Sequence, residues 1–383
     1  MNVQNKKKLL FITIDPIEYR RRVLDQISVA RECGFKVSVI SLGERGKAYK
    51  NAGNFFHEKR IFVRFQNGPL KFIEFNLKLF WSILWNRYEI IHLRGLWVLP
   101  AVMMRQIVRR SHLVYDAHEY FAGLEIFHNR PFRKHIWLSV EKLSIPHINT
   151  LITVSEPLGD LFLNLYPKLK RILILKNMPS TRDIQPFDLG KFNPSKKRYK
   201  MIFHGYFLSG RALIQTIKAI TLLQDISLDV TLIGQGPLKR KLEHLVEQYM
   251  LQNIVTFQPF LDRDRLMPVI AQADIGLSLI EDDCLNRRYA LPNKFFELVS
   301  AGVPVLASNI RTLKFYMDKY DLGLTVDPQN IIEISEAIKK MLLDVNQRRQ
   351  WTLNCLSAAR KDLNWEQEAE KLKQCYTALL ADN

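Results

Sequence analysis

The sequence predicts an α/β protein with two doubly wound domains, each a parallel sheet covered by helices. Short apolar segments rich in β-branched residues alternate with helical segments through the first half of the chain. The same rhythm restarts after a polar, proline-containing stretch from Asn177 to Lys200, which is interpreted as a linker. Strands that are apolar along their whole length are typical of parallel sheets buried on both faces. At about 150 residues per domain, the 383 residues allow two to three domains.

The first half of the chain contains six predicted strands with helices between them. These strands are Leu9 to Ile14, Lys36 to Leu42, Glu89 to Leu93, Leu113 to Asp116, Thr150 to Val154 and Ile172 to Leu175. The first one resembles a signal peptide, but its apolar run is short and ends at Asp15, without a small-residue cleavage site. Residues 1–178 are therefore expected to form one Rossmann-like domain.

The second half repeats this pattern and closes with a helix. Its predicted strands are Met201 to His204, Asp229 to Ile233, Ile254 to Phe257, Asp274 to Leu279, Val303 to Ala307 and Gly323 to Val326. Residues 179–364 are expected to form the second Rossmann-like domain. Residues 365–383 have apolar positions at helical spacing and are expected to form a helix that packs back on the first domain. Ligands of open α/β sheets bind outside the carboxyl ends of the strands, so the site is expected to draw on both domains.

The composition is that of a globular protein with a strong positive charge. Hydrophobic residues make up 47% and charged residues 25%, which excludes disordered and fibrous classes. Lysine and arginine number 56 against 38 acidic residues, giving a net charge of +18. An anionic partner is therefore expected: a phosphorylated substrate, a membrane surface or a nucleic acid.

The cysteines and the hydropathy indicate where the protein works. Cys33, Cys284, Cys355 and Cys375 are widely spaced, with no CxxC pair, which is typical of a reducing compartment without structural zinc. The most apolar stretch is too short for the roughly 20 residues that cross a bilayer. We expect a cytoplasmic protein, either soluble or peripheral on the inner face of the cell membrane.

The strongest local motif is YALPNKFFELVSAGVPVLAS, from Tyr289 to Ser308. It predicts a loop, a helix from Lys294 to Ala301 that is capped by Gly302, and a buried strand. The N–H groups and the positive dipole end at the start of such a helix suit a phosphate. The residues placed at that start are Leu291, Pro292, Asn293 and Lys294.

Glu297 is a single acid inside this otherwise apolar helix. A carboxylate there needs hydrogen-bond donors, and the two hydroxyls of a ribose supply a pair of them. A structural carboxylate is the simpler alternative for Glu297. A solvated surface lysine is the corresponding alternative for Lys294, and a packing aromatic for Tyr289.

A second motif is FHGYFLSGRALIQTIKAI, from Phe203 to Ile220. The predicted strand ends at Gly205, and a loop containing Gly210 leads to Arg211, which is expected to open an amphipathic helix. Glycine lets a backbone approach a ligand, and arginine at a helix start adds a fixed charge to the dipole. The segment matches neither a P-loop nor a GxGxxG fingerprint. Arg211 as a solvated residue at a helix start is the alternative.

The order of these segments resembles the retaining nucleotide-sugar glycosyltransferases of glycosyltransferase family 4. HGYFLSGRALI, VTLIGQGP, LPNKFFELVSAGVPVLAS and the terminal NWEQEAEKLKQCY carry the resemblance in the second half. DPIEYRRRVLDQISVARECGFKVSVI, VYDAHEYF, ITVSEPLGDLF and LKNMP carry it in the first. The resemblance covers nearly the whole chain and implies the GT-B fold, with an acceptor domain followed by a donor domain.

The resemblance implies a role for several residues. Glu297 matches the second glutamate of the E(x)7E motif, which is expected on the donor ribose. Arg211 matches the basic residue placed against the donor diphosphate, and His118 the histidine near the transferred sugar. Tyr289 stands where the first glutamate is usual, and Tyr206 replaces an arginine common after the glycine equivalent to Gly205. Diphosphate binding would then depend on Arg211, Lys294 and backbone N–H groups. For His118, an ordinary hydrogen-bonded histidine is the alternative.

The expected reaction is transfer of a hexosyl or related group from a nucleotide sugar to a glycan or polyprenyl-linked acceptor, with retention. Fixed cations stabilise the departing diphosphate, so neither a metal nor another cofactor is expected. Asp262 and Asp264 match the letters of a DxD pair but are expected to begin a surface helix. Asp282 and Asp283 are expected to shape the donor loop, with metal binding as the alternative. Bacterial cell-envelope polysaccharide synthesis is the setting that the resemblance implies.

Other classes of function are alternatives to glycosyl transfer. Hydrolysis by paired carboxylates would need two acids flanking the sugar, and Glu119 with Glu281 is the pair available. A basic nucleic-acid-binding protein, or a non-catalytic nucleotide-binding α/β protein, is the alternative outside enzymology. No nucleic-acid-binding motif is found, so no nucleic acid is expected as a partner.

Basic and aromatic residues are interleaved between Lys59 and Arg87, and HNRPFRKH, from His128 to His135, adds a second basic cluster. This combination suits an anionic membrane surface. A core helix whose aromatic residues pack on the sheet is the alternative. The two interpretations are compatible if one face of the helix packs on the sheet while the residues at its edge contact the membrane.

Overall fold

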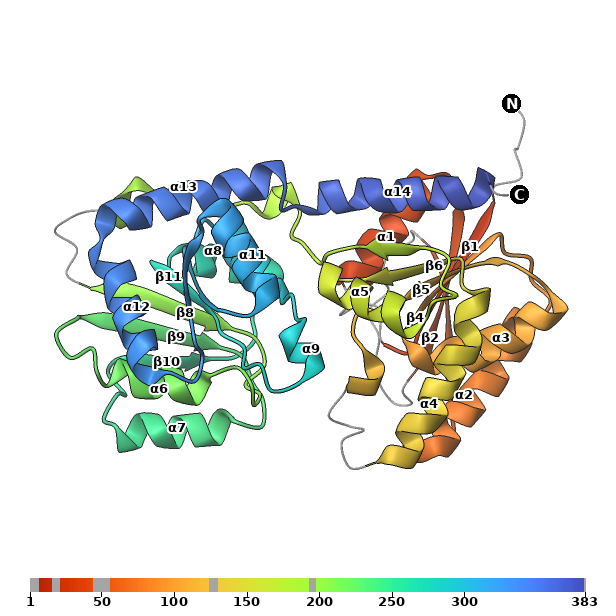
Figure 1. Cartoon of the computed structure of the whole chain (residues 1–383), viewed down its shortest axis with the longest axis horizontal. Coiled ribbons are helices and arrows are strands. Elements are labelled where there is room, and N and C mark those ends of the chain that lie inside the picture. The colour runs from red at the N-terminus through yellow and green to blue at the C-terminus, as the bar shows by residue number, and fades with distance from the viewer. Residues whose placement is uncertain (1–6, 16–20, 44–55, 124–129, 193–197, 382–383) are drawn as a thin grey trace. The chain divides into compact units, whose positions relative to one another are not determined.

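The computed structural model divides the chain into two compact units (Figure 1). It describes residues 7–15, 21–43, 56–123, 130–192 and 198–381. The first unit comprises Met1–Lys176 together with Glu368–Asn383, and the second comprises Asn177–Gln367. The divisions therefore lie at 176/177 and 367/368, where the sequence predicts 178/179 and 364/365. Part of the opening loop, residues 16–20, and His128 and Asn129 of the second basic cluster lie outside the described residues.

The first unit contains a parallel sheet of seven strands in the order β3-β2-β1-β4-β5-β6-β7. The strands are β1 Lys8–Thr13, β2 Lys36–Gly43, β3 His57–Phe62, β4 Ile90–Arg94, β5 His112–Asp116, β6 Thr150–Thr153 and β7 Ile172–Ile174. Strand β3 is missing from the sequence-based prediction. Its residues HEKRIF are mostly charged, and it lies at the edge of the sheet, paired to β2 alone.

Helices cover both faces of this sheet (Figure 1). They are α1 Arg21–Glu32, α2 Gly68–Ile83, α3 Leu99–Val108, α4 Pro131–Ser144, α5 Glu156–Leu165 and α14 Trp365–Ala381. In α2, α3, α4 and α5 a proline stands in the first turn, where its missing N–H would have no partner within the helix. Pro69, Pro100, Pro131 and Pro157 thus mark the helix starts.

Helix α14 packs on the first unit, far in sequence from the strands it covers. The side chains of Leu372 and Tyr376 are fully buried. The hydroxyl of Tyr376 lies 2.7 Å from Nδ1 of His92 in β4. Burial lowers the pKa of His92 to about 4, so the ring is neutral near pH 7.

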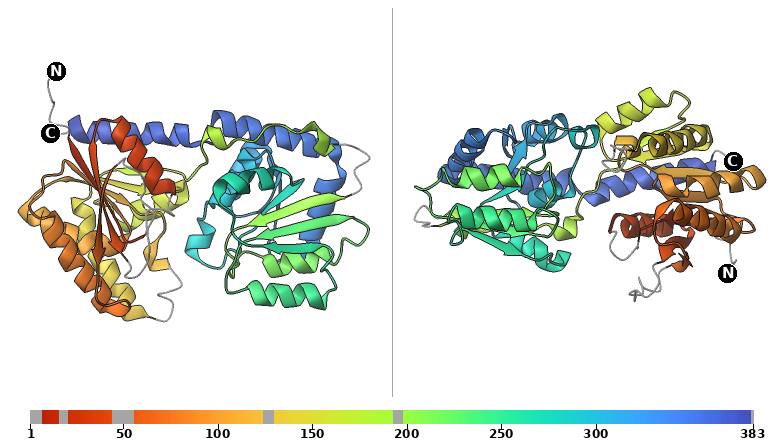
Figure 2. Two further views of the ribbon diagram at one scale, coloured as in Figure 1. Left: turned by 180° about the vertical axis from the view of Figure 1, so that it is seen from behind. Right: turned by 90° about the horizontal axis from the view of Figure 1, so that it is seen from below.

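The second unit contains a parallel sheet of six strands in the order β10-β9-β8-β11-β12-β13. Figure 2 shows this unit from two further sides, in green to blue. The strands are β8 Tyr199–His204, β9 Leu228–Ile233, β10 Val255–Gln258, β11 Ile275–Ser278, β12 Val305–Ser308 and β13 Gly323–Val326. The helices are α6 Leu213–Ile220, α7 Lys239–Gln248, α8 Arg263–Ala271, α9 Leu285–Arg288, α10 Asn293–Ser300, α11 Arg311–Tyr320, α12 Ile331–Leu343 and α13 Val345–Lys361.

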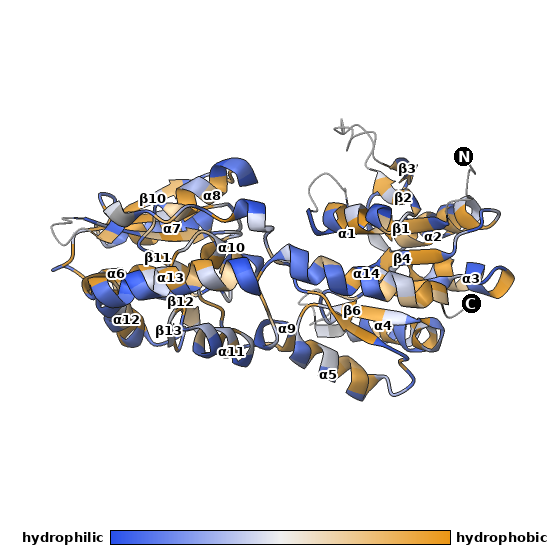
Figure 3. Ribbon diagram, turned by 90° about the horizontal axis from the view of Figure 1, so that it is seen from above, coloured by the Kyte–Doolittle hydropathy of each residue, from blue (hydrophilic) through white to orange (hydrophobic). Residues whose placement is uncertain are grey.

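Two apolar cores lie on the two faces of the second sheet. One joins the strands to α6, α7 and α12, and the other joins them to α8, α10, α11 and α13. The strands themselves are strongly hydrophobic (Figure 3). Each unit is thus a doubly wound, Rossmann-like α/β domain, as the sequence predicts. Among the described helices, none combines the length and the hydropathy needed to span a bilayer.

Candidate functional site

The candidate site lies at the carboxyl end of β8 in the second unit. Gly205 follows β8 directly, and Gly234 follows β9. Gly234 has φ +152°, and a Cβ there would stand 1.9 Å from the carbonyl oxygen of Gly205. Only glycine allows the two loops to approach so closely, so LIGQGP does more than turn a strand into a helix.

Arg211 lies in the loop between β8 and α6. The sequence predicts that Arg211 opens the helix, and this is wrong: α6 begins at Leu213. The reason is Ala212, whose φ of +49° is left-handed and interrupts a right-handed helix. Burial lowers the pKa of Arg211, and the nearby charge of Arg287 lowers it further.

Arg287 of α9 fits against Gly210 in the same loop. A Cβ at Gly210 would lie 2.4 Å from a guanidinium nitrogen of Arg287, and the glycine has φ +76°. Arg287 is also paired with Asp283. Gly210 thus allows a second arginine to lie beside Arg211.

Lys294, in the first turn of α10, is 7% exposed and is not a solvated surface lysine. Its Nζ lies 4.2 Å from the centre of the Phe203 ring. Among the described residues, Nζ has no hydrogen-bond partner. Burial lowers the pKa of Lys294 well below that of an ordinary lysine, and the charge of Arg211 adds to this effect. Such a buried ammonium is costly unless an anion is bound.

The start of α10 presents backbone N–H groups beside this lysine. The helix begins at Asn293, with Pro292 in an extended conformation as its N-cap and no side chain capping the end. Leu291 is buried, while Asn293 is exposed. Helix starts with uncapped N–H groups bind anions readily.

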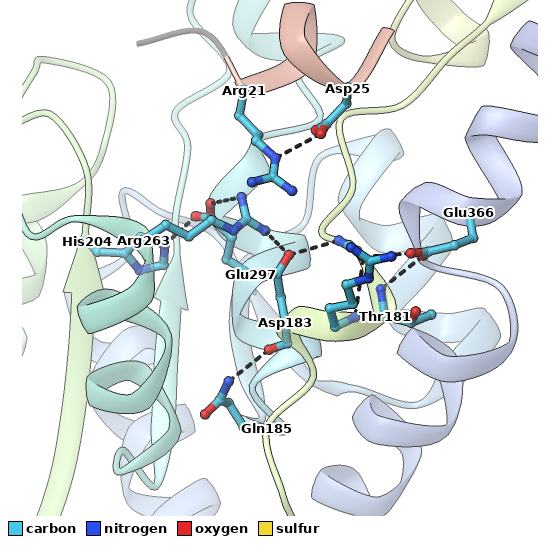
Figure 4. A network of polar contacts seen from close by, with 11 residues as sticks. Arg21, Asp25, Thr181, Asp183, Gln185, His204, Arg263, Glu297 and Glu366 are labelled. Carbon is cyan, nitrogen blue, oxygen red and sulfur yellow. Dashed lines mark hydrogen bonds and ion pairs between the residues drawn. The ribbon is translucent and has the colours of Figure 1, made fainter. Parts of the chain in front are cut away.

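Glu297, one turn further along α10, is held in a network of polar contacts (Figure 4). Its carboxylate lies 2.8 Å from Nε2 of His204, the last residue of β8, and 3.8 Å from the guanidinium of Arg263. Burial raises the pKa of Glu297, but the hydrogen bond and charge of His204 and the charge of Arg263 outweigh it and lower the pKa. Glu297 is therefore an ionised carboxylate.

Sequence reasoning missed His204 and Arg263 as parts of the site. Arg263 lies at the start of α8, as expected of the DRD segment, but it also binds Asp183 at 2.8 Å. Asp183 comes from the stretch interpreted as a linker. One feature of the sequence could have indicated His204 as a site residue: it is a polar residue between the end of an apolar strand and a glycine.

Asp282 and Asp283 lie just before α9, and Tyr289 lies just after it. Asp282 lies 2.9 Å from Arg288, and Asp283 binds Arg287. Tyr289 ends the short helix α9 and is partly buried. Within the described ranges, no three His, Cys, Asp or Glu side chains group together as metal ligands.

His118 belongs to the first unit, where it lies two residues after the end of β5. Its Nε2 lies 3.3 Å from the carboxylate of Glu119. The neighbouring Asp116 is buried and binds Arg22 and Gln26 of α1 at 3.0 to 3.2 Å. Glu281, the other acid weighed for hydrolysis, belongs to the second unit, where its N–H donates to the carbonyl of Gly210.

The structure thus brings together, in the second unit, most of the residues singled out in the sequence. These are Gly205, Gly210, Arg211, Leu291, Pro292, Asn293, Lys294 and Glu297. The cations of this group are Arg211, Lys294 and the neighbouring Arg287. The start of α10 and the carboxylate of Glu297 lie in the same group. Such an arrangement can bind a polyanion next to a hydroxyl-rich group.

Two family models match the chain, one in each unit. The family model described as "Glycosyl transferases group 1" matches residues 185–355, and the model "Glycosyltransferase Family 4" matches residues 20–178. A search of curated protein sequences found no match.

Several solved structures share the fold of the whole chain. Sucrose-phosphate synthase from Thermosynechococcus elongatus has a TM-score of 0.79 at 17% identity, covering 99% of this chain and 100% of that one. WaaG, a glycosyltransferase involved in lipopolysaccharide biosynthesis, has a TM-score of 0.73 at 15% identity, covering 96% and 99%. Anabaena HepE in complex with UDP-glucose has a TM-score of 0.72 at 13% identity, covering 97% and 99%.

The two family models together match both units, in the order that the resemblance implies. Because both models describe glycosyltransferases, the matches favour glycosyl transfer over nucleic-acid binding. The chain belongs to the GT-B glycosyltransferases of the family 4 type.

Proposed function

We propose that this glycosyltransferase takes its sugar from a nucleoside diphosphate sugar that binds at the start of α10. One observation carries the proposal: Nζ of Lys294 is buried, lacks a hydrogen-bond partner in the described chain, and lies close enough to Arg211 for the two charges to interact. A buried pair of cations is stable only when an anion lies between or beside them. A diphosphate provides that anion, and the uncapped N–H groups of α10 add to its binding.

Glu297 is proposed to hold the ribose of the donor. His204 and Arg263 fix the carboxylate and keep it ionised. An ionised carboxylate has about four lone-pair positions, so it can accept from two ribose hydroxyls while keeping these partners. Gly205 leaves open space beside the site, since a Cβ there would meet nothing within 4 Å.

Arg211 and Lys294 are proposed as the groups that stabilise the departing diphosphate. Negative charge grows on the phosphates as the bond from sugar C1 to the phosphate oxygen breaks. Cations that are fixed in advance stabilise that charge more in the transition state than in the ground state. These two side chains supply the positive charge from the chain itself, so we propose a reaction that needs no metal and no other cofactor.

We propose that the anomeric configuration is retained. The acceptor hydroxyl attacks C1 from the face that the diphosphate leaves, the new C1–O bond forms as the old one breaks, and the acceptor proton passes to the departing phosphate oxygen. His118 is proposed to lie near the transferred hexosyl or related group. Which sugar the enzyme selects depends on loops such as that of Tyr289.

The acceptor is proposed to be a glycan or a polyprenyl-linked lipid of the bacterial cell envelope. WaaG acts in lipopolysaccharide biosynthesis, and the HepE structures contain UDP, glucose or UDP-glucose, which supports a role of this class. A lipid-linked acceptor places the enzyme on the cytoplasmic face of the membrane, attached peripherally. In α2, Phe75 is fully buried while Trp81 is 63% exposed, so one face packs on the sheet and the other is available for docking.

A thermal-shift screen over UDP, GDP, ADP and their sugars tests the donor proposal. A ligand at 100 times its dissociation constant stabilises the folded state by about 2.7 kcal/mol. One nucleotide should raise the melting temperature and the others should not. If none of them changes it, the donor site is placed wrongly.

Arg211→Ala should then abolish most turnover while the fold survives. Loss of one preorganised donor to a developing anion typically lowers the rate about 10² to 10³-fold. The measurement is kcat with the nucleotide sugar found in the screen, and Arg240→Ala on α7 is the matched control, an exposed arginine in the same unit. If Arg211→Ala keeps the wild-type kcat, Arg211 does not stabilise the departing diphosphate.

A further inference from the structure

A cavity in the first unit lies at the opposite end of the sheet from its carboxyl edge. It opens beside Glu89, His112 and Asn149, which stand at the amino ends of β4, β5 and β6. The glycosyl-transfer chemistry makes no use of this end, because ligands of open α/β sheets bind at the carboxyl ends. The cavity therefore needs a separate explanation.

The lining of this cavity is strongly basic. Arg87, Arg109, Arg110 and Lys170 contribute four positive charges, with His112 and His147 beside them. None of the four has a described carboxylate within 4 Å. The one acid in the lining, Glu89, accepts the main-chain N–H of Lys8.

The negative carboxyl ends of nearby helices do not balance the four positive charges of the lining. Helices α2, α3 and α4 end near the cavity, and each carboxyl end carries about half a negative charge. Three ends and Glu89 therefore amount to about two and a half negative charges, against four positive ones. An excess of positive charge is left for an anion from outside.

Large apolar side chains are exposed around the same opening. Ile107 and Leu143 line the cavity and are 87% and 75% exposed. Trp85, two residues before the lining residue Arg87, and Val108, between the lining residues Ile107 and Arg109, are 74% and 66% exposed. These side chains come from the ends of α2, α3 and α4, which lie side by side on one face of the sheet (Figure 1).

We propose that this cavity binds the phosphate headgroup of an anionic membrane lipid, while Trp85, Ile107, Val108 and Leu143 enter the interfacial layer. A soluble phosphate metabolite would use the cations but would leave the apolar side chains in water. A bilayer with anionic lipid satisfies both, since it offers phosphates at the surface and acyl chains just below. The inference deepens the membrane docking of the proposed function and rests on it.

Binding to vesicles tests the site directly. The full-length protein is sedimented with vesicles of phosphatidylglycerol and phosphatidylcholine, and with phosphatidylcholine alone, at low and high salt. Arg87→Glu combined with Arg110→Glu should weaken binding to the anionic vesicles by about tenfold or more, because each basic residue near the surface contributes strongly. Arg240→Glu combined with Lys241→Glu, two exposed residues of α7, makes the same change in net charge and should alter binding less than about twofold.

The apolar part is tested in the same way. Ile107→Ser should weaken binding, and Ile332→Ser, at an exposed position of α12, should not. The nucleotide-induced thermal shift must be unchanged in every variant, which shows that the donor site is intact.

Three outcomes would overturn the site. If the two charge-reversed double variants lose binding equally, net charge alone drives docking. If wild-type protein ignores anionic vesicles at low salt, both this site and the proposed membrane docking are wrong, whereas an intact thermal shift and sugar transfer would leave the enzymatic proposal standing. If inorganic phosphate stabilises the wild type but not the Arg87→Glu, Arg110→Glu variant, and vesicles do not bind, the ligand is a soluble phosphate.

Discussion

Two residues of the proposed donor site, Lys294 and Glu297, are largely buried, and the pKa of each is altered by its surroundings. Lys294 is an amine buried without a hydrogen-bond partner in the described part of the chain, and Glu297 is a carboxylate kept ionised in spite of burial. Burial opposes the charged form of both, whereas neighbouring cations destabilise the charged lysine by repulsion and stabilise the charged glutamate by attraction, so that they lower both pKa values. Perturbed groups of this kind concentrate at functional sites.

The protonation of Lys294 should depend on the donor. Burial and the charge of Arg211 hold its pKa well below that of an ordinary lysine, and the negative charge of the proposed diphosphate would raise it again. Between these two values, binding takes up a proton. The affinity for the nucleoside diphosphate should therefore rise as the pH falls through that window.

Calorimetry in buffers of different ionisation enthalpy measures this uptake. The wild type should take up close to one proton per nucleotide within the window. Lys294→Met should take up none and bind more weakly, whereas Lys314→Met, at an exposed position of α11, should behave as the wild type. Proton uptake that persists in Lys294→Met would show that another group titrates.

Glu297→Gln should raise KM for the donor more than it changes kcat. A ribose contact is equal in the ground and transition states, so its loss appears in binding. A hydrogen bond to a charged group contributes about 1.5 to 3 kcal/mol, which corresponds to roughly 10 to 150-fold in KM. If KM stays intact while kcat collapses, Glu297 is catalytic and the ribose role is wrong.

His204 offers a test of how that carboxylate is positioned. His204→Gln keeps an N–H donor for Glu297, and His204→Leu removes it while filling similar space. KM should therefore rise less in the glutamine variant than in the leucine variant, with kcat nearly unchanged in both. Equal effects would mean that His204 has only a structural role in the core.

At the scale of elements, the sequence allowed the apolar strands to be predicted and failed where charge or a rare backbone conformation intervened. The strands of both sheets with continuous apolar runs lie close to their expected positions. Strand β3 was not predicted, because an edge strand needs only one partner and can carry Glu58, Lys59 and Arg60. The start of α6 was displaced because a left-handed alanine has no sequence signature.

The same contrast holds for the site. Arg211 and Lys294 were predicted because each stands where a loop meets a helix in the sequence, and Glu297 because it is a single acid inside an otherwise apolar helix. The ion pairs of Glu297 with His204 and Arg263 were not predicted, since they join α10, the end of β8 and the start of α8, which only the tertiary structure brings together. A sequence shows which side chains are placed at the carboxyl edge, but not which of them pair.

At the scale of the whole molecule, the chain leaves the first unit at Lys176 and returns to it at Glu368. The return is fixed by contacts at both ends of this segment. The carboxylate of Glu368 accepts the N–H of Lys176 at 2.7 Å, and Tyr376 reaches His92 in the middle of the sheet. Cys375 lies 3.7 Å from the hydroxyl of Thr150 in β6. The last helix is thus part of the core of the first unit, although it follows the whole second unit in sequence.

Tyr376→Ala should therefore destabilise the first unit and leave the second intact. Replacing a fully buried aromatic side chain by alanine costs about 3 to 5 kcal/mol. Tyr376→Phe keeps the volume but leaves Nδ1 of His92 without its partner, which costs about 1 to 3 kcal/mol. Hydrogen exchange at one fixed pH should show protection lost from β4 and β6, more in the alanine than in the phenylalanine variant, while β8 and β9 keep theirs. Equal loss in β8 and β9 would mean that the units unfold together, and unchanged protection in β4 would mean that α14 adds nothing to the first core.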